Sequence, residues 1–366
     1  MKTMKIITTV CWIITALAII GLATFFLTGT IFGIAINGRD SNRPFGLNFN
    51  IGGWERLSGS YELDGSYNVS TAGIDTINID WIAGRVDVKP HDGSEILINE
   101  YSQRKLTDDE KLYFTTSGST LSVKFRERSF TGNMQQKRME MLVPRSLCES
   151  LNRFVLDSTS GSVHVDSLNA DMFKVNTISG SAELSSIVSG TFSVDSTSGS
   201  IRINGAHSDD MRIHSISGSI RVSDSDAGYL DVDTTSGSVN VAGAFNDVKL
   251  NSISGRQTLD NSASRSGLRA ESTSGSLDFS GSYENGDIHS LSGSVSFKST
   301  VVPSTLKVHT TSGSITIAVP NEGSVSVHHS STSGRLTSDI PMTTAGSGAQ
   351  FDLASTSGSV KIVAIG

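Results

Sequence analysis

The sequence predicts an all-β protein whose main part is a β-solenoid, a parallel β-helix of stacked coils, and three observations support this fold class. A Ser-Gly core recurs with a period of about 19 residues from residue 150 onward, and self-similarity at a short, fixed period is typical of solenoids. Around each glycine, apolar and polar residues alternate, which is the period of a half-buried strand. Proline, which central strands exclude, occurs there only as Pro303, Pro320 and Pro341.

An uncharged, apolar segment occupies residues 6–36. About 20 residues suffice to cross the hydrocarbon core of a bilayer, so the segment predicts one transmembrane helix within an anchor of residues 1–36. Lys2 and Lys5 precede it, and no basic residue follows before Arg39. We therefore expect a single-pass protein of the cell membrane, with a cytoplasmic N-terminus and an extracytoplasmic C-terminal domain. A cleaved signal peptide is the alternative, but its apolar part would be about half as long.

Residues 37–73 are rich in Gly, Asn and Ser and predict a stalk. Apolar residues alternate within it from Phe45 to Ile51, which is also the pattern of a strand docked on the domain, and both interpretations stay open. Residues 74–149 are predicted to form the first β part of the exported domain. The Ser-Gly-Ser repeats of residues 150–366 follow and form the β-solenoid.

Each repeat unit is predicted to contain a strand, a bend with glycine, a second strand and a short polar loop. The bend needs glycine because a tight corner between stacked coils requires a positive φ or a close backbone approach. We expect this structural role for eleven glycines: Gly161, Gly180, Gly199, Gly218, Gly237, Gly255, Gly275, Gly293, Gly313, Gly334 and Gly358.

The residue two positions before these glycines alternates between Thr and an aliphatic residue for nine units. Equivalent residues of successive coils stack in columns about 4.8 Å apart. With two units per coil, threonines would stack on threonines along one edge and aliphatic residues on aliphatic residues along the other. This is the arrangement we predict. The aliphatic residues form an interaction stripe if they face outward, and belong to the core if the glycine bend inverts the alternation. They are Ile178, Ile216, Ile253 and Leu291.

Four positions before the glycine, a coil of two units would stack acidic residues along one edge: Asp157, Asp195, Asp233 and Glu271. Such neighbours repel by up to about 1 kcal/mol each in water-like surroundings. The column is expected to be hydrated carboxylates, with a divalent-cation site as the alternative. The other edge would alternate Asn and His, with the histidines too far apart to share a zinc ion. We predict no metal and no cofactor.

The sequence predicts no enzyme. No nucleophile elbow, P-loop, metal-protease helix or dinucleotide fingerprint is present, and the acids form a regular column rather than a local catalytic pair. A net charge of −7 argues against a nucleic-acid-binding protein, which normally has a basic surface. Of the two cysteines, Cys11 lies in the apolar segment and Cys148 is expected to be buried and inert.

Five segments between residues 74 and 145 follow a recognisable order: 79–81, 84–88, 92–96, 121–123 and 141–144. Together with the Ser-Gly-Ser repeats, they resemble the DUF4097 family of envelope-associated β-strand-repeat proteins, often labelled "putative adhesins". The resemblance covers residues 74–366. It implies a right-handed, single-chain β-solenoid outside a membrane, in a family with anchored members beside regulators of cell-envelope stress. It implies no catalytic residue.

Two functions from different classes follow from these observations. The first is a non-enzymatic interaction scaffold, anchored in the membrane, whose partners are other envelope or membrane proteins. The alternative is an adhesin or cell-wall module that binds carbohydrate, a function that usually needs exposed aromatic side chains. The repeats hold few aromatic residues, and several fall on inward positions, which favours protein partners.

Two further features leave alternatives open. The basic residues Arg126, Arg128, Lys137 and Arg138 predict a hairpin loop with solvated charges or, alternatively, contact with an anionic wall polymer. The sequence ends on an apolar strand, and an open coil end is a template for β pairing. Either the irregular segment 340–350 covers this end or another molecule does, in which case Val363→Lys would disrupt oligomers.

Overall fold

The computed structural model describes residues 30–31, 34–35, 60–127, 135–343 and 348–365. Residues 59–127 and 136–366 form one compact unit, and residues 1–58 and 128–135 form another. In the second of these, β1 (Thr30–Ile31) pairs antiparallel with β2 (Ile34–Ala35). The rest of the predicted anchor and most of the predicted stalk lie outside the described residues. Among the described residues, no helix has the length and apolar character needed to span a bilayer.

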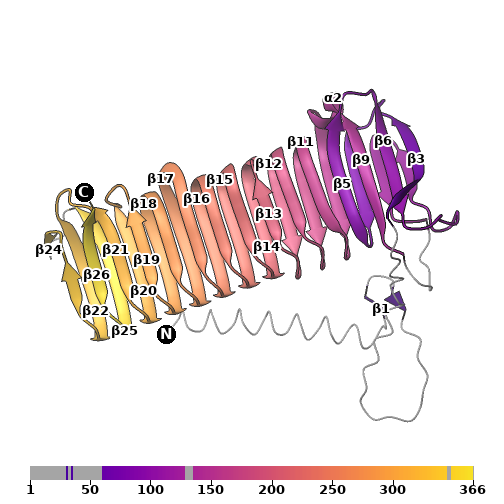
Figure 1. Cartoon of the computed structure of the whole chain (residues 1–366). Helices are drawn as coiled ribbons and strands as arrows, with labels where there is room; N and C mark the ends of the chain where they lie inside the picture. Colours follow the sequence, from indigo (N-terminus) through magenta and orange to yellow (C-terminus); the bar gives the residue numbers. More distant parts are fainter. Residues whose placement is uncertain (1–29, 32–33, 36–59, 128–134, 344–347, 366) are drawn as a thin grey trace, which may run out of the picture. The chain divides into compact units, whose positions relative to one another are not determined.

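The larger unit is built from one continuous sheet of 24 strands, and its described residues contain one short helix, α2 (Arg145–Cys148). Figure 1 shows the strands side by side as successive rungs of a stack. The strands of the regular part are β10 (Leu151–Ser158), β11 (Ser162–Thr177), β12 (Ala182–Ser196), β13 (Ile201–Asn204), β14 (His207–Ser217), β15 (Ile220–Ser236), β16 (Val239–Ser254), β17 (Gln257–Ser274), β18 (Leu277–Ser292), β19 (Val295–Ser299), β20 (Thr305–Ser312) and β21 (Ile315–Pro320). All of these pair in parallel, as expected of a β-solenoid.

One repeat unit makes one coil. Val163 of β11 lies opposite Ala182 of β12, and these two residues are one unit apart in the sequence, as are the repeat glycines Gly161 and Gly180. Units of slightly different length continue this register, as where Val232 lies opposite Leu250. The prediction of two units per coil is therefore wrong. The alternation that suggested it runs along a single surface column, where like residues need not stack because no core packing constrains them.

Each coil has three straight sides. In one coil, residues 154–158 form the first side, residues 162–166 the second and residues 168–170 the third. The first corner holds the repeat glycine. The second corner bends through a positive φ in four successive coils: Ser167 (54°), Ser186 (54°), Gly205 (68°) and Asp224 (50°). At the third corner the strand pairing skips one residue of each coil.

The core runs through the centre of the stack. Phe154, Phe173 and Phe192 occupy equivalent positions, and their rings stack at centroid distances of 5.2 Å. Aliphatic residues line the other inward columns, and most have no accessible surface. Because each coil covers the apolar face of the next, the hydrophobic contacts that stabilise the domain are shared between repeats.

Both ends of the stack are closed by coils that are out of sequence order. At the N-terminal end, β4 (Thr76–Trp81) and β5 (Gly84–His91) pair with β10 and β11 on one side. On the other side they pair with β8 (Thr120–Lys124) and β9 (Lys137–Pro144). The coil that comes first in sequence is therefore covered by a later one.

The C-terminal end mirrors this arrangement. The strands β25 (Ala349–Ser357) and β26 (Val360–Ile365) insert between β20 and β21 on one side and β22 (Val325–Ser333) and β23 (Leu336–Ser338) on the other. The strand β24 (Met342–Thr343) adds to β22. The preceding repeat therefore covers the last strand in sequence, and the described part of segment 340–350 instead pairs, through β24, with β22 at the outer edge of the stack.

Antiparallel strands complete the N-terminal end: β3 (Glu62–Ser70), β6 (Glu95–Ser102) and β7 (Tyr113–Ser117). Beneath them the Nζ of Lys137, a side chain with 1% exposure, donates to Oε1 of Glu100 at 2.6 Å. The same Nζ lies 4.2 Å from the ring centroid of Phe125. The predicted basic cluster is thus not one solvated surface, because Lys137 belongs to the core.

Candidate functional site

The repeat glycines form one column at the first corner of the coils. A Cβ on Gly199 would lie 1.8 Å from the carbonyl oxygen of Gly180, and one on Gly313 would lie 2.1 Å from that of Gly293. No side chain fits between such closely stacked backbones. Because the last coils are exchanged, Gly334 lies against Gly358 rather than Gly313. We call the residues from two before to one after each repeat glycine the Ser-Gly corner.

Hydrogen bonds fix the backbone of the Ser-Gly corner in two ways. In the early coils a buried hydroxyl closes the turn, as where the N–H of Gly199 donates to Oγ of Ser196 at 3.0 Å. From Gly218 onward the glycine N–H donates to the next coil instead, as from Gly237 to the carbonyl of Ser254 at 3.2 Å. Either way the corner is held rigidly, so its exposed side chains have fixed positions.

The predicted interaction stripe lies on this corner and faces outward. Ile178, Ile216 and Leu291 are 39%, 56% and 43% exposed, and Ile253 is half-buried. They do not form a separate edge, because a coil of one unit places a threonine between each pair. We call this surface the Thr/Ile column, which consists of Thr159, Ile178, Thr197, Ile216, Thr235, Ile253, Thr273, Leu291 and Thr311.

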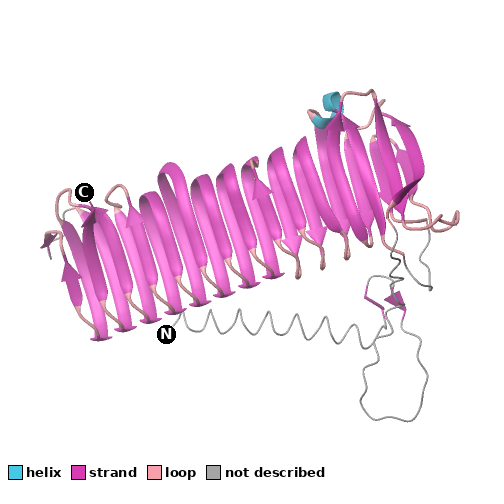
Figure 2. Cartoon of the chain, viewed as in Figure 1, coloured by secondary structure: helices cyan, strands magenta, loops and turns pink. Residues whose placement is uncertain are grey.

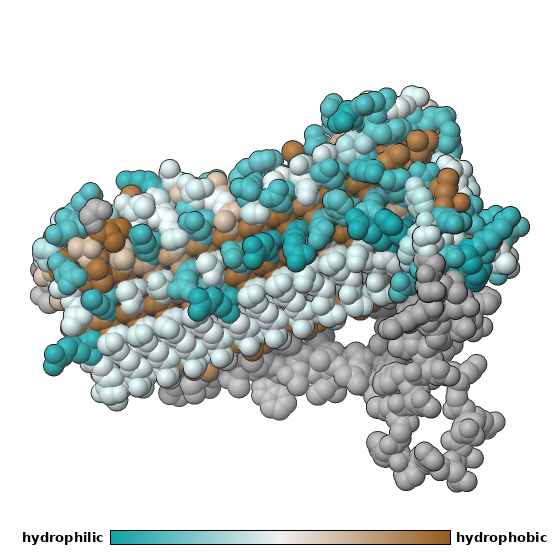
Figure 3. All heavy atoms as spheres, in the orientation of Figure 1, coloured by the Kyte–Doolittle hydropathy of each residue, from teal (hydrophilic) through white to brown (hydrophobic). Residues whose placement is uncertain are grey.

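The Ser-Gly corner is almost free of charge. Between Thr159 and Ser314 its only charged residue is Arg256, whose guanidinium lies 3.4 Å from the carboxylate of Asp278 on the neighbouring side. Strands such as β14, β20 and β25 end at this corner, and their arrowheads lie along the lower edge of the stack in Figure 1. Figure 3, in the same orientation, shows a pale band along that edge, where residues are neither strongly hydrophilic nor strongly hydrophobic. More hydrophilic and more hydrophobic residues lie beside the band.

The predicted acidic column is interleaved with hydrogen-bond donors. The residues at this position are, in stacking order, Asp157, Asn176, Asp195, His214, Asp233, Asn251, Glu271 and His289. The prediction that the acids stack on one another is wrong, because the coil is half as long as expected. The repulsion that suggested a cation site is thereby removed. Among the described residues, no three His, Cys, Asp or Glu side chains are grouped as metal ligands would be.

His214 is the clearest example of this interleaving. Its Nδ1 lies 3.2 Å from a carboxylate oxygen of Asp195, and its Nε2 lies 3.4 Å from one of Asp233. The hydrogen bond with Asp195, reinforced by the charges of both carboxylates, raises the pKa of His214. The same hydrogen bond lowers the pKa of Asp195. His214 therefore links two carboxylates of neighbouring coils on this side of the stack.

Aromatic side chains offer no platform on the repeats. Of the nine aromatic residues after residue 150, eight are buried and Tyr229 is half-buried. Stacking of sugar rings needs exposed aromatic faces. This part of the chain therefore lacks the feature that would favour a carbohydrate ligand.

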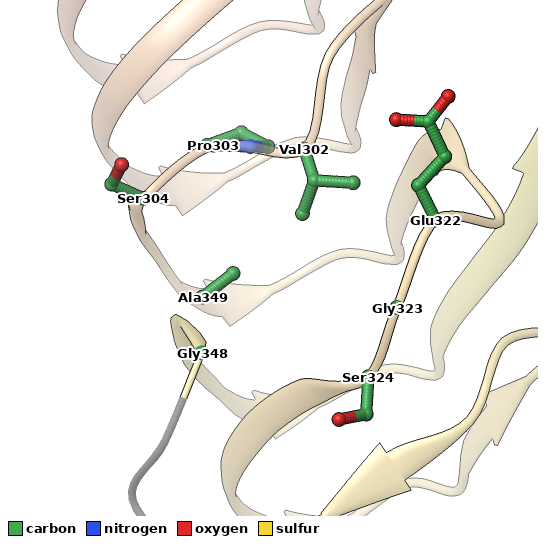
Figure 4. A pocket seen from close by; sticks show the side chains of 8 residues that line it. All are labelled: Val302, Pro303, Ser304, Glu322, Gly323, Ser324, Gly348 and Ala349. Carbon is green, nitrogen blue, oxygen red and sulfur yellow. The ribbon is translucent and has the colours of Figure 1, made fainter.

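Two shallow clefts are open to solvent. One of about 480 Å³ lies where the last coils are exchanged, and Val302, Pro303 and Glu322 line it; Figure 4 shows the Glu322 carboxylate near its rim. The other, of about 500 Å³, lies beside Asp80 and Asp157, where burial and the Asp157 charge raise the pKa of Asp80. In the first cleft the Ser304 hydroxyl donates to the Glu284 carboxylate, and in the second Asp80 and Asp157 lie on neighbouring strands.

Comparison with known proteins places most of the chain in one family. The sequence model of the family described as Toastrack DUF4097 matches residues 74–245 and 230–363. No curated protein matches the chain.

Several solved structures match over most of the chain at low identity. A "putative lipid binding protein" from Parabacteroides distasonis ATCC 8503 is 14% identical, with 84% of this chain and 98% of that chain covered and a TM-score of 0.39. A "putative adhesin" from the same organism is 13% identical, with 84% and 98% covered and a TM-score of 0.25. A "putative adhesin" from Bacteroides fragilis NCTC 9343 is 12% identical, with 83% and 98% covered and a TM-score of 0.24.

Proposed function

Because the chain belongs to the Toastrack DUF4097 family, we propose that it is a non-enzymatic scaffold, anchored in the cell membrane, whose Ser-Gly corner binds other proteins of the cell envelope. The anchor in this proposal is the apolar segment of residues 6–36, whose basic flank favours an extracytoplasmic domain. The observation that carries the proposal is the row of exposed or half-buried aliphatic side chains on a corner whose only charged residue from Thr159 to Ser314 is Arg256.

Exposed aliphatic residues on a rigid surface favour binding of a partner. Complete burial of an aliphatic side chain contributes about 1.5–3 kcal/mol, so covering the exposed half of Ile216 is worth on the order of 1 kcal/mol. The hydrogen-bonded corner loses little conformational freedom on binding, so the added cost of ordering it is small. Four such residues together contribute at most on the order of 4 kcal/mol, so a partner that follows the stack must also gain contacts with the residues beside them.

The regularity of the surface also supports a binding role over catalysis. A catalytic site brings unlike groups together at one point and shifts their pKa values. The Ser-Gly corner instead repeats the same few residue types from coil to coil, which suits an extended partner.

Affinity capture from gently solubilised membranes tests the proposal. The full-length protein is compared with Ile216→Asp and with the matched control Val188→Asp, since Val188 is 45% exposed on another side of the coil. We expect a partner protein with the wild type and the control, and a yield lowered by roughly tenfold or more with Ile216→Asp, because a buried charge costs well over about 1.4 kcal/mol.

Two results would contradict the proposal that the Ser-Gly corner binds another envelope protein. Equal capture by all three proteins would show that the Ser-Gly corner is not the binding surface. If no protein is captured and the wild type is instead retained on isolated cell wall, the adhesin alternative replaces the scaffold.

A further inference from the structure

The alternation within the Thr/Ile column is not explained by folding. Its side chains point away from the core, and Ile216 is more than half exposed. Threonine and isoleucine are both favourable on an exposed strand, so either residue would serve at every coil. The chain nevertheless alternates them over eight successive coils, from Thr159 to Leu291. Folding of the domain therefore does not by itself require this order.

The alternation gives the surface a period of two coils. Neighbouring coils lie about 4.8 Å apart, so the longer aliphatic side chains recur roughly every 10 Å with a shorter threonine between them. The column is therefore a row of projections separated by hollows. A partner that fills the hollows must carry projections with the same spacing, and a second copy of this chain carries them.

We propose that two copies of the chain associate side by side through the Thr/Ile column, with the aliphatic residues of each copy opposite the threonines of the other. This inference rests on the proposed function, because it names a partner for the same corner. The partner is a second copy, and the contact is isologous, with the same surface used on both sides.

A two-fold axis perpendicular to the stack satisfies this pairing along the whole column. With the axis between the coils of Ile216 and Thr235, four pairs form, each meeting an aliphatic residue with a threonine of the other copy: Ile216 with Thr235, Ile253 with Thr197, Ile178 with Thr273, and Leu291 with Thr159. An axis placed on a coil would instead set aliphatic on aliphatic and threonine on threonine.

Charge permits this contact despite a net charge of −7 on each chain. The only charged residue of the Ser-Gly corner in this stretch is Arg256, which already pairs with Asp278. The acidic side chains lie on the flanking sides, and several of them pair there with His, Lys or Arg, as at His214. Two corners therefore meet without bringing like charges into contact.

The size of the contact predicts a weak dimer. The contact runs over eight coils, a length of roughly 38 Å at about 4.8 Å per coil, but uses only one narrow corner of each coil. So narrow a contact lies among the small interfaces, where transient complexes are found. Because this axis makes the two stacks antiparallel, anchoring both copies in one membrane would favour the dimer only with the stacks lying along the membrane surface.

Self-association of the full-length protein in detergent micelles tests the inference. Sedimentation velocity over a range of protein concentrations compares the wild type with Ile216→Ser, Thr235→Ile and the control Val188→Ser. Each residue occurs twice in a symmetric dimer, so we expect the first two variants each to raise the dissociation constant by roughly tenfold or more. The control should match the wild type, and circular dichroism should show the same strand signal in all four proteins.

The Thr235→Ile variant distinguishes interlocking side chains from a simple apolar contact. Interlocking requires it to weaken the dimer, because the new side chain fills a hollow that receives Ile216 of the other copy. If Thr235→Ile strengthens association, the corner is only an apolar patch and the interlocking is overturned. A wild type that stays monomeric at all concentrations overturns the inference as a whole, whereas the scaffold function fails only if membrane capture finds no protein dependent on Ile216.

Discussion

A single methyl group at residue 199 tests the stacking of the coils. The substitution is Gly199→Ala, and its Cβ would lie 1.8 Å from the carbonyl oxygen of Gly180. Real Cβ atoms essentially never lie within 3.0 Å of such an atom, so the two coils must separate locally until the distance of 1.8 Å has grown beyond 3.0 Å. Because φ of Gly199 lies outside the left-handed range, the effect comes from this contact and not from backbone strain.

The cost follows from the hydrogen bonds at the corner. Three bonds of 2.9–3.0 Å hold residues 197–199: Thr197 N–H to the Thr177 carbonyl, Ser198 N–H to the Ile178 carbonyl, and Gly199 N–H to the Ser196 hydroxyl. A separation that relieves the contact breaks the first two, which join the coils, and distorts the third, and each bond contributes on the order of 1 kcal/mol. We expect Gly199→Ala to lower the free energy of unfolding by about 2–3 kcal/mol.

Urea denaturation followed by circular dichroism measures this loss. Gly190→Ala is the matched control, since its Cβ would lie 3.2 Å from the Asp171 carbonyl oxygen, and we expect it to cost less than about 1 kcal/mol. If Gly199→Ala unfolds within about 1 kcal/mol of the wild type, with an unchanged dependence on urea, the glycines do not stack as described and the reasoning fails.

Three further predictions concern residues outside the Ser-Gly corner. Burial raises the pKa of the Cys148 thiol to about 11, so a thiol reagent at pH 8 should modify the folded Cys11→Ser protein only after unfolding; rapid labelling of the native state would contradict this. The raised pKa of His214 means that its ion pairs stabilise the fold fully below the unfolded pKa of 6.5 and are lost as pH rises through the folded value. The stability difference between the wild type and His214→Gln should therefore shrink from pH 6 to pH 8, and a difference independent of pH would refute the assignment. Lys137→Met leaves the buried carboxylate of Glu100 without its cation and should cost about 3–5 kcal/mol in urea, a loss that adding Glu100→Gln should partly reverse; a cost below about 1 kcal/mol would show that the pair is not buried.

The regular part of the fold was accessible from the sequence because its signals are local. Alternation around residues 192–203 gives two strands, and the intervening Ser-Gly gives the corner. The length of the coil was not accessible, because an exposed column such as that of Thr197 and Ile216 does not require like residues to stack. The predicted stacking of acidic residues on one another assumed two units per coil, so it was wrong for the same reason.

The ends of the stack depend on contacts that no local pattern encodes. The intervals before Gly334 and Gly358 are longer than those between the earlier repeat glycines, and this did indicate irregular coils. That the last coils stack out of sequence order could not be read from a local pattern, because it depends on β25 pairing with β20 on one side and β22 on the other. Lys137 could have been recognised as buried, because it has the same strand parity as Met139 and Met141, but its charge suggested the surface.

If the Thr/Ile column is a binding surface, it should be in contact with another molecule in the cell. Photocross-linking in living cells tests this, with a benzophenone amino acid in place of Ile216 or, as the control, of Val188. We expect a discrete cross-linked product, with a second copy or another envelope protein, from position 216 and none from position 188. No product from position 216, or the same product from both positions, would contradict it.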